Sequence, residues 1–119
     1  MTTTRSLLLH AAEPAEACCE GTVASPDLDL ARGDALASQL KALADPTRLR
    51  MLDLLVAQEV PLCVCEITTQ FAQQQPTISH HLRILRGAGL IAGEKRGVWS
   101  YYQATQTGRR SMSLVKTLL

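Results

Sequence analysis

The sequence predicts a mainly α-helical protein with one small β-hairpin. Aromatic residues account for only 3% of the 119 residues, and the 46% hydrophobic content is mostly leucine and alanine, which favour helices over sheets. From residue 29 onward, apolar residues recur at intervals of three and four, the spacing of a helix that packs on one face. Only residues 90–103 have the composition of paired strands, and they surround a glycine that can close a tight turn.

The size and composition are those of one soluble globular domain. No apolar run approaches the roughly 18 residues of a membrane-spanning helix, and the run at Leu7–Leu9 is too short for a secretory signal. We therefore expect a cytoplasmic protein. The net charge of +1 is unevenly divided: residues 1–45 carry three basic and seven acidic side chains, and residues 46–119 carry nine basic and four acidic ones. The basic second part holds the motifs that are described below.

The first 27 residues differ in pattern from the rest of the chain. They mix threonine, alanine, glutamate and proline without sustained periodicity, so residues 1–27 are predicted to form a mobile arm. This arm carries Cys18 and Cys19. Residues 28–119 are predicted to form one folded domain.

Two helices are predicted between residues 29 and 57. The first runs from about Asp29 to Ala44, where leucines fall at i, i+4 and i+7. The second runs from Pro46 to about Ala57, because Asp45 can cap the free amides and proline is favoured at the first helical position. The apolar faces consist of Leu36, Leu40 and Leu43 in the first helix and Leu49, Leu52, Leu55 and Val56 in the second.

A further pair of helices follows a short strand. Leu62 to Val64 is long enough only for an edge strand, and Glu66 to Ala72 is predicted to be a third helix. After the polar turn at Gln73–Pro76, a fourth helix extends to Gly87–Gly89. Its inward stripe consists of Ile78, Leu82 and Leu85.

The last part of the chain is predicted to be a hairpin and a helix. Leu90–Glu94 and Val98–Gln103 flank Lys95-Arg96-Gly97, in which the glycine supplies the positive φ of a tight turn. The predicted terminal helix runs from Thr107 to Leu119, with Met112 and Val115 on its apolar stripe.

Two short helices joined by a polar turn and followed at once by a hairpin are typical of a winged helix-turn-helix domain, in which the second helix enters the DNA major groove. With the apolar stripe of the fourth helix inward, helical rotation turns its polar residues outward. We predict that these residues and the basic hairpin contact bases and phosphates. The predicted DNA-binding residues are Gln75, Thr77, Ser79, His80, Arg83, Arg86, Lys95 and Arg96. Trp99, Tyr101 and Tyr102 are expected to pack in the wing rather than to stack on nucleic acid, and His81 is expected to be a packed, hydrogen-bonded histidine.

Four separate motifs stand out in the chain: Leu43–Arg50, Cys63–Glu66, Gln75–Leu82 and Ala88–Leu90. Together they resemble the ArsR/SmtB family of metal-responsive repressors, and the resemblance spans about residues 36–103. It implies a homodimeric winged-helix repressor that leaves operator DNA when it binds a metal or metalloid, and residues 28–119 would serve both DNA binding and dimerisation. As in relatives, the last helix would form the dimer interface with the first, through Leu114, Leu118 and Leu119. The chain departs from the family at Gln74, where relatives usually have a serine, a better helix cap.

Four cysteines in two close pairs are the candidate sensor. Thiolates select soft ions, and Cys63 and Cys65 at i, i+2 project to one side if the backbone is extended. Some arsenic-responsive relatives place a third cysteine three residues later, where this chain has Thr68. The predicted metal site therefore combines Cys63 and Cys65 with Cys18, Cys19 or both.

The inducer is predicted to be As(III) or Sb(III). Three thiolates suit a pyramidal trivalent centre and four suit tetrahedral Cd(II), so a Cd(II)- or Pb(II)-responsive repressor is the alternative. The adjacent arm cysteines resemble those of arsenite-responsive members. The carboxylate and histidine site of zinc-sensing members is missing, because no Asp, Glu or His follows Glu94.

The thiols are compatible with two other functions. Cys63 and Cys65 can instead form a redox switch in a DNA-binding protein. A thiol-dependent enzyme is the least favoured, because the chain has no CxxC motif, no glycine-rich loop and no alternating βαβ pattern. The protein is therefore predicted not to be an enzyme.

Overall fold

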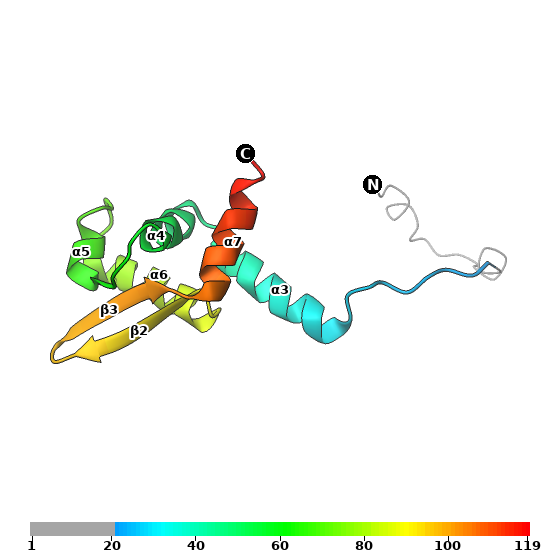
Figure 1. Cartoon of the computed structure of the whole chain (residues 1–119), viewed down its shortest axis with the longest axis horizontal. Coiled ribbons are helices and arrows are strands. Elements are labelled where there is room, and N and C mark those ends of the chain that lie inside the picture. Colours follow the sequence, from blue (N-terminus) through cyan, green and yellow to red (C-terminus); the bar gives the residue numbers. More distant parts are fainter. Residues whose placement is uncertain (1–20) are drawn as a thin grey trace.

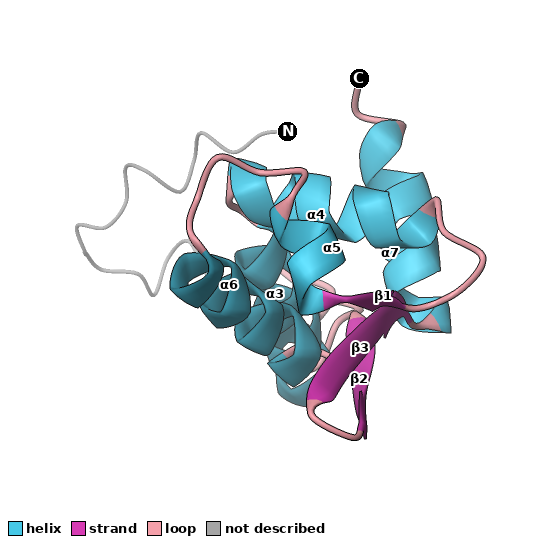
Figure 2. Cartoon of the chain, turned by 90° about the vertical axis from the view of Figure 1, so that its left-hand side faces the viewer, coloured by secondary structure: helices cyan, strands magenta, loops and turns pink. Residues whose placement is uncertain are grey.

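A computed structural model describes residues 21–119. Its elements are α3 (Leu30–Leu43), α4 (Pro46–Val56), β1 (Leu62–Cys63), α5 (Val64–Thr68), α6 (Gln75–Gly87), β2 (Ile91–Arg96), β3 (Trp99–Ala104) and α7 (Gln106–Lys116). The predicted fold class is confirmed: the domain is mainly helical with one small antiparallel sheet (Figures 1 and 2). Cys18 and Cys19 lie outside the described residues. Within residues 21–119, no helix is long and apolar enough to cross a membrane.

Side-chain caps set the starts of the longer helices. The carboxylate of Asp29 accepts a hydrogen bond from the backbone N–H of Arg32 at 2.8 Å, and Asp45 accepts one from Arg48 at 3.0 Å. The bond from Arg48 is the main reason why the pKa of Asp45 lies below its ordinary value. The start of α4 therefore agrees with the one predicted from Asp45, and α3 agrees with the range predicted from its leucine spacing.

The core lies between α4, α6, α7 and the sheet. Eight of its side chains are fully buried: Met51, Leu52, Leu55, Ile67, Ile78, Leu82, Leu85 and Leu90. Only the last turn of α3 joins this core, through Ala42 and Leu43. The rest of α3 extends away from the body of the domain (Figure 1). Consequently Leu36 and Leu40, which share the stripe of Leu43, are 45% and 60% exposed.

The sheet joins the thiol segment to the hairpin. Its strand order is β1-β3-β2, all antiparallel, with Cys63 opposite Tyr101. Arg96 is opposite Trp99, so the hairpin turn consists of Gly97 and Val98 alone. The positive φ predicted for Gly97 is confirmed at 66°. Lys95 and Arg96, predicted in the turn, instead continue β2.

The third helix differs from the prediction. It was predicted at Glu66–Ala72, but α5 starts two residues earlier because the backbone N–H of Cys63 donates to Glu66 Oε1 at 2.9 Å. It ends at Thr68, before the predicted end at Ala72, because two hydroxyls bond to backbone carbonyls there. The Thr68 hydroxyl donates to the Val64 carbonyl at 2.7 Å, and the Thr69 hydroxyl donates to the Glu66 carbonyl at 2.7 Å. The terminal helix is also shorter than predicted, since α7 ends at Lys116.

Candidate DNA-binding surface and thiol site

One fully buried face holds α6 against the domain. Ile78, Leu82 and Leu85 are each 0% exposed, and burial of each contributes about 1.5–3 kcal/mol. The inward stripe predicted for this helix is therefore confirmed. His80 and Arg83 lie on the opposite side of the helix. Among the predicted reading residues, Gln75, Thr77, His80, Arg83 and Arg86 are exposed, and Ser79 is half-buried. His80 Nδ1 and Arg83 Nη1 are 3.4 Å apart, so these two side chains lie together on the exposed face.

The turn before α6 is held by a contact that sequence reasoning missed. As expected, the side chain of Gln74 makes no capping hydrogen bond. Instead, Gln73 Nε2 donates to Thr47 Oγ1 of α4 at 2.9 Å. Nothing in the local sequence signals this pair, because its members are 26 positions apart.

Arg48 connects three helices, and this role was also missed. Its Nε donates to the Ala42 carbonyl at the end of α3, at 2.6 Å. Its Nη1 lies 3.3 Å from Nδ1 of His81 in α6. The half-buried His81 is thus hydrogen-bonded, as expected, and the end of α3 is linked to the helix that presents His80.

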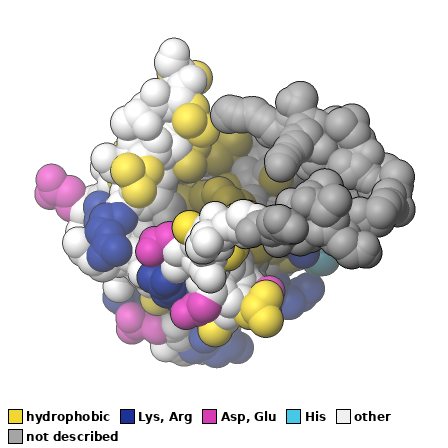
Figure 3. All heavy atoms as spheres, turned by 90° about the vertical axis from the view of Figure 1, so that its right-hand side faces the viewer, with side chains coloured by type: hydrophobic (Ala, Val, Ile, Leu, Met, Phe, Trp, Pro, Cys, Tyr) yellow, Lys and Arg dark blue, Asp and Glu magenta, His cyan; other side chains and the backbone are white. Residues whose placement is uncertain are grey.

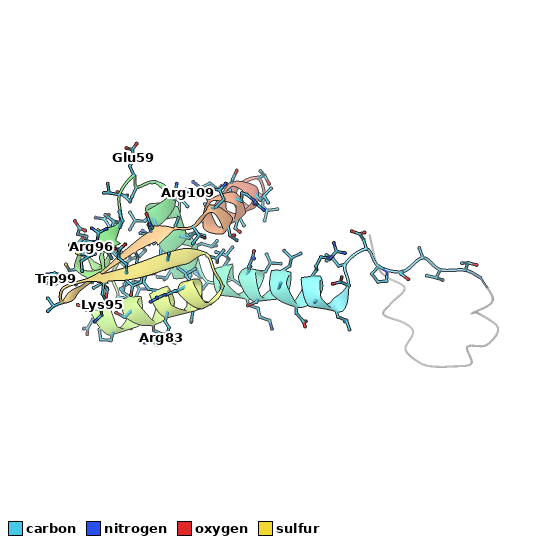
Figure 4. The ribbon with its side chains drawn as sticks, turned by 60° about the horizontal axis from the view of Figure 1, so that its bottom comes forward. Glu59, Arg83, Lys95, Arg96, Trp99 and Arg109 are labelled. Carbon is cyan, nitrogen blue, oxygen red and sulfur yellow. The ribbon has the colours of Figure 1, made fainter. Side chains whose placement is uncertain are left out.

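The two basic residues of the hairpin lie on opposite faces. Lys95 lines a cavity of about 140 Å³ together with Arg86 of α6. Arg96 is on the other side, where its Nε lies 3.2 Å from Glu94 Oε2 and its guanidinium lies 4.6 Å from the centre of the Tyr101 ring. Figure 4 shows this separation, with Lys95 on the side of Arg83. Lys95 has no acidic partner within residues 21–119.

The prediction that all three hairpin aromatics pack in the wing is wrong for Trp99. Tyr102 does pack against the core, and Tyr101 is half-buried. Trp99 is 52% exposed, because it directly follows the turn, where the hairpin has passed beyond the core (Figure 4).

The thiols of Cys63 and Cys65 converge, although not through an extended backbone. Cys63 precedes the first residue of α5, and Cys65 lies in its first turn. Their sulfurs are 2.8 Å apart. Cys63 is buried and Cys65 is exposed, so one sulfur of the pair is open to solvent. The hydrogen bond to Cys63 is the main cause that raises the pKa of the Cys65 thiol.

Two sulfurs are the only soft ligands that the described residues bring together. Within residues 21–119, no group of three or more His, Cys, Asp or Glu side chains is placed to hold a metal ion. The hydroxyl of Thr68 is bonded to the Val64 carbonyl within its own helix. The predicted contribution of Cys18 and Cys19 lies outside the described residues.

Comparisons with known proteins agree with this architecture. Residues 45–92 match the family described as "Bacterial regulatory protein, arsR family". The chain is 51% identical over 63 residues to the arsenic resistance transcriptional regulator ArsR1 of Pseudomonas putida, covering 53% of this chain and 48% of that protein. It is 50% identical over 62 residues to an uncharacterized HTH-type transcriptional regulator of Methanocaldococcus jannaschii, covering 52% and 68%. The match therefore spans about half the length of the first of these relatives and two thirds of the second.

A solved structure extends the similarity to most of the fold. It is the homodimeric winged helix-turn-helix DNA-binding domain of a possible ArsR-family transcriptional regulator from Mycobacterium bovis. The TM-score is 0.68 at 30% identity, and the alignment covers 82% of this chain and 89% of the M. bovis domain. The chain described here is a winged helix-turn-helix protein that belongs to the ArsR family of transcriptional regulators.

Proposed function

We propose that the protein is a transcriptional repressor that binds operator DNA as a homodimer and is released by As(III) or Sb(III). The observation that carries this proposal is the 2.8 Å approach of two cysteine sulfurs at the start of the helix-turn-helix. A soft trivalent centre that binds both sulfurs would act directly on α5, which packs against α6. Relatives named for arsenic or arsenical resistance support the choice of a metalloid.

The exposed leucines of α3 and α7 support the homodimer. Leu36 and Leu40 on α3, and Leu114 on α7, are 45%, 60% and 69% exposed. Figure 3, which views the molecule from the right-hand side of Figure 1, shows hydrophobic side chains on that face. Exposed apolar surface of this kind favours association. A dimer would also present two α6 helices to two half-sites about one helical turn of DNA, or a multiple of it, apart.

The chemistry of the inducer predicts how its binding depends on pH. Arsenous acid and three thiols give a tris-thiolate and three waters, so no net proton is released. A divalent cation binds thiolates, so it must displace the thiol protons. The raised pKa of Cys65 means that its proton is retained to higher pH, which weakens binding of the cation at lower pH. Between about pH 6 and 8, release of DNA by arsenite should change little, whereas release by Cd(II) should become much more effective as pH rises.

The test uses the reduced full-length protein and a duplex that the protein itself selects from a random-sequence library. Fluorescence anisotropy of the labelled duplex is followed while arsenite, antimonite, Cd(II), Pb(II) or Zn(II) is added. We expect release by arsenite and antimonite at the lowest concentrations. Cys63→Ser and Cys65→Ser should bind the duplex normally and resist release, and Thr69→Ser, an exposed position on the same segment, is the matched control.

Two results would contradict the proposal. One is wild-type release by arsenite from the Cys63→Ser/Cys65→Ser double variant. The other is wild-type release from the Cys18→Ser/Cys19→Ser double variant, because we propose that the arm supplies the remaining thiolate from Cys18, Cys19 or both.

A redox switch is the second candidate, because the same short sulfur–sulfur distance favours oxidation of the pair. Oxidation to a disulfide removes two electrons and two protons from the thiols, which a peroxide can accept on forming water. If hydrogen peroxide releases the duplex from the wild type while arsenite does not, the redox switch replaces the metalloid site.

A further inference from the structure

A cavity lies where α3, α4 and α6 meet. Its volume is about 330 Å³, more than twice that of the cavity beside Lys95, and this size falls at the lower end of the range of small-ligand sites in proteins. Neither the thiol pair nor any of the predicted reading residues lines it. Three of its lining residues carry hydrogen-bond donors and three are apolar, namely Ser38, Lys41 and Arg48, and Ala42, Ile84 and Ala88.

The charge of this lining is entirely positive. Lys41 and Arg48 supply two cations, and no Asp or Glu of residues 21–119 lines the cavity. The closest acid in the sequence, Asp45, caps α4 through the backbone N–H of Arg48 and makes no salt bridge with its guanidinium. The cavity therefore offers charge to a ligand that is an anion.

Arg48 is held in place by groups that do not neutralise it. Its Nε donates to the Ala42 carbonyl at 2.6 Å and its Nη2 to the Lys41 carbonyl at 3.3 Å. Its Nη1 lies 3.3 Å from Nδ1 of His81. These bonds use three of the five N–H groups of a guanidinium, so two remain for a ligand. The half-buried guanidinium is thus oriented in advance and still carries its full charge.

Lys41 adds a second charge beside the first. Its backbone carbonyl is bonded to Arg48, and both side chains line the same cavity. Lys41 makes no salt bridge with any acid of residues 21–119. Two like charges in a partly desolvated site repel each other, and a bound anion relieves this repulsion. The pair therefore favours an anion over a neutral ligand.

The size and the apolar residues of the cavity identify the class of anion. An inorganic oxyanion would occupy only a small part of 330 Å³ and would leave Ile84 and Ala88 without apolar contact. A carboxylate matches the planar fork of Arg48, and an aliphatic or aromatic body attached to it can cover the apolar residues. The cavity is best suited to a small organic carboxylate.

We propose that this cavity binds a small organic carboxylate through Lys41 and Arg48, and that its occupancy changes the affinity for operator DNA independently of the thiols. The cavity is lined by both α3 and α6, which lie side by side (Figure 2). A bound carboxylate would therefore fix the end of α3 to the helix that presents His80. The change in DNA affinity rests on the proposed DNA-binding function, whereas binding of the carboxylate does not.

Binding is measured by isothermal titration calorimetry of phenylacetate into the reduced full-length protein. We expect one site per chain and a dissociation constant of about 1 mM or below, which is ordinary for a ligand of about ten non-hydrogen atoms. Phenylacetamide has the same shape without the charge and should bind at least about tenfold more weakly. Inorganic phosphate lacks the apolar body and should also bind more weakly.

Variants assign the binding to this cavity. Lys41→Gln should weaken binding of phenylacetate by about threefold, because this side chain is exposed, and Arg48→Gln by at least about tenfold. Because Arg48 also holds the end of α3, a second variant leaves both charges in place: Ala88→Leu fills the cavity and should abolish binding. Arg32→Gln removes a charge from α3 outside the cavity and is the matched control. Circular dichroism verifies that each variant is folded.

The effect on DNA is measured by anisotropy of a labelled, library-selected duplex. Phenylacetate replaces chloride at constant ionic strength, because duplex binding depends on salt. Saturating phenylacetate should change the affinity for the duplex by about fivefold or more, in the wild type and in the Cys63→Ser/Cys65→Ser double variant alike. The Ala88→Leu variant should bind the duplex and show no response to phenylacetate.

The possible results separate the two proposals. If no duplex binds while calorimetry shows the carboxylate site, the DNA-binding function fails and the site stands. The site is overturned if phenylacetate does not bind, if Ala88→Leu binds it as tightly as the wild type, or if phosphate binds as tightly as phenylacetate. Binding of phenylacetate that leaves duplex affinity unchanged overturns the proposed effect on DNA.

Discussion

Cys63 lies directly opposite Tyr101 in the antiparallel pair of β1 and β3. The backbone that carries the buried thiol is therefore joined to the strand that forms one side of the hairpin. The ring of Tyr101 also supports the guanidinium of Arg96, with its centre 4.6 Å from the Arg96 Cζ. Cys63 is thus in direct contact with two elements, because its strand pairs with the hairpin and its backbone N–H starts α5.

The first prediction concerns this connection. Arsenite added to the DNA-free protein should change the emission of Trp99, because a ligand on Cys63 shifts the strand paired with β3. The change should saturate at the arsenite concentration that releases DNA and be absent in Cys63→Ser. Release of DNA by arsenite without any change in Trp99 emission would show that the hairpin takes no part and that α5 alone moves α6.

The second prediction concerns the third thiolate. Position 68 lies three residues after Cys65 and on the same face of α5, so Thr68→Cys places a sulfur beside the existing pair. In the Cys18→Ser/Cys19→Ser background, Thr68→Cys should restore release of DNA by arsenite. Thr68→Ser in that background is the control, and it should not respond. Failure of Thr68→Cys, with arsenite binding to it verified by mass spectrometry, would show that the arm itself moves the domain.

The third prediction separates base reading from phosphate contact. His80→Ala should lower the preference for the selected duplex over random DNA, whereas Lys95→Ala should weaken both equally and reduce the slope of log K against log salt by about one. Glu94→Gln should strengthen binding to both duplexes, because it removes an acid and frees Arg96. Equal losses on both duplexes for His80→Ala and Lys95→Ala would contradict the role of α6.

The fourth prediction concerns Gly108, which allows α7 to lie against the backbone of Leu90. A Cβ on Gly108 would overlap the Leu90 carbonyl oxygen, and that backbone atom cannot yield as a flexible side chain would. Gly108→Ala should lower the free energy of unfolding by about 2–4 kcal/mol or displace α7, as overpacking does. Gly33→Ala, in α3 with open space around it, should instead raise stability by about 0.5–1 kcal/mol. Urea denaturation measures both, and equal effects would contradict the packing argument.

The fifth prediction concerns the acid limit of stability. Because the pKa of Asp45 is lowered in the folded state, its stabilisation is complete above about pH 5 and is lost as pH falls through the lowered value. Asp45→Asn keeps a capping oxygen and removes the charge. Between pH 5 and 2, its stability should fall less steeply than that of the wild type, by at most about 1.4 kcal/mol per pH unit. Parallel curves from thermal unfolding would show that the carboxylate is not better stabilised in the folded state.

Local signals in the sequence predicted the elements whose ends depend on local chemistry. Asp45 marks the start of α4, and the structure shows its carboxylate capping that helix, whereas the leucine spacing marked the range of α3. The stripe of α6 and the positive φ of Gly97 were predicted for the same reason, since each depends on residues close together in the chain.

Features that depend on distant residues were not predictable in this way. The start of α5 is a local exception: the backbone N–H of Cys63 is bonded to Glu66, only three positions later, but cysteine is not a standard N-cap residue and so gave no sequence signal. The link from Arg48 to His81 spans 33 positions. The exposure of Trp99 depends on where the hairpin passes beyond the core, and its composition alone favours a buried aromatic.

The shortness of α5 has a mechanical consequence. A helix of five residues has almost no stability of its own, so its shape is imposed by Ile67, which is fully buried, and by the Glu66 bond at its start. Cys65 lies in the first turn and Cys63 directly before it, so the thiol pair is carried by an element whose shape depends on these two contacts. An inducer that binds the two sulfurs, as proposed, would therefore deform this short helix before it disturbs the packing of the fully buried side chains.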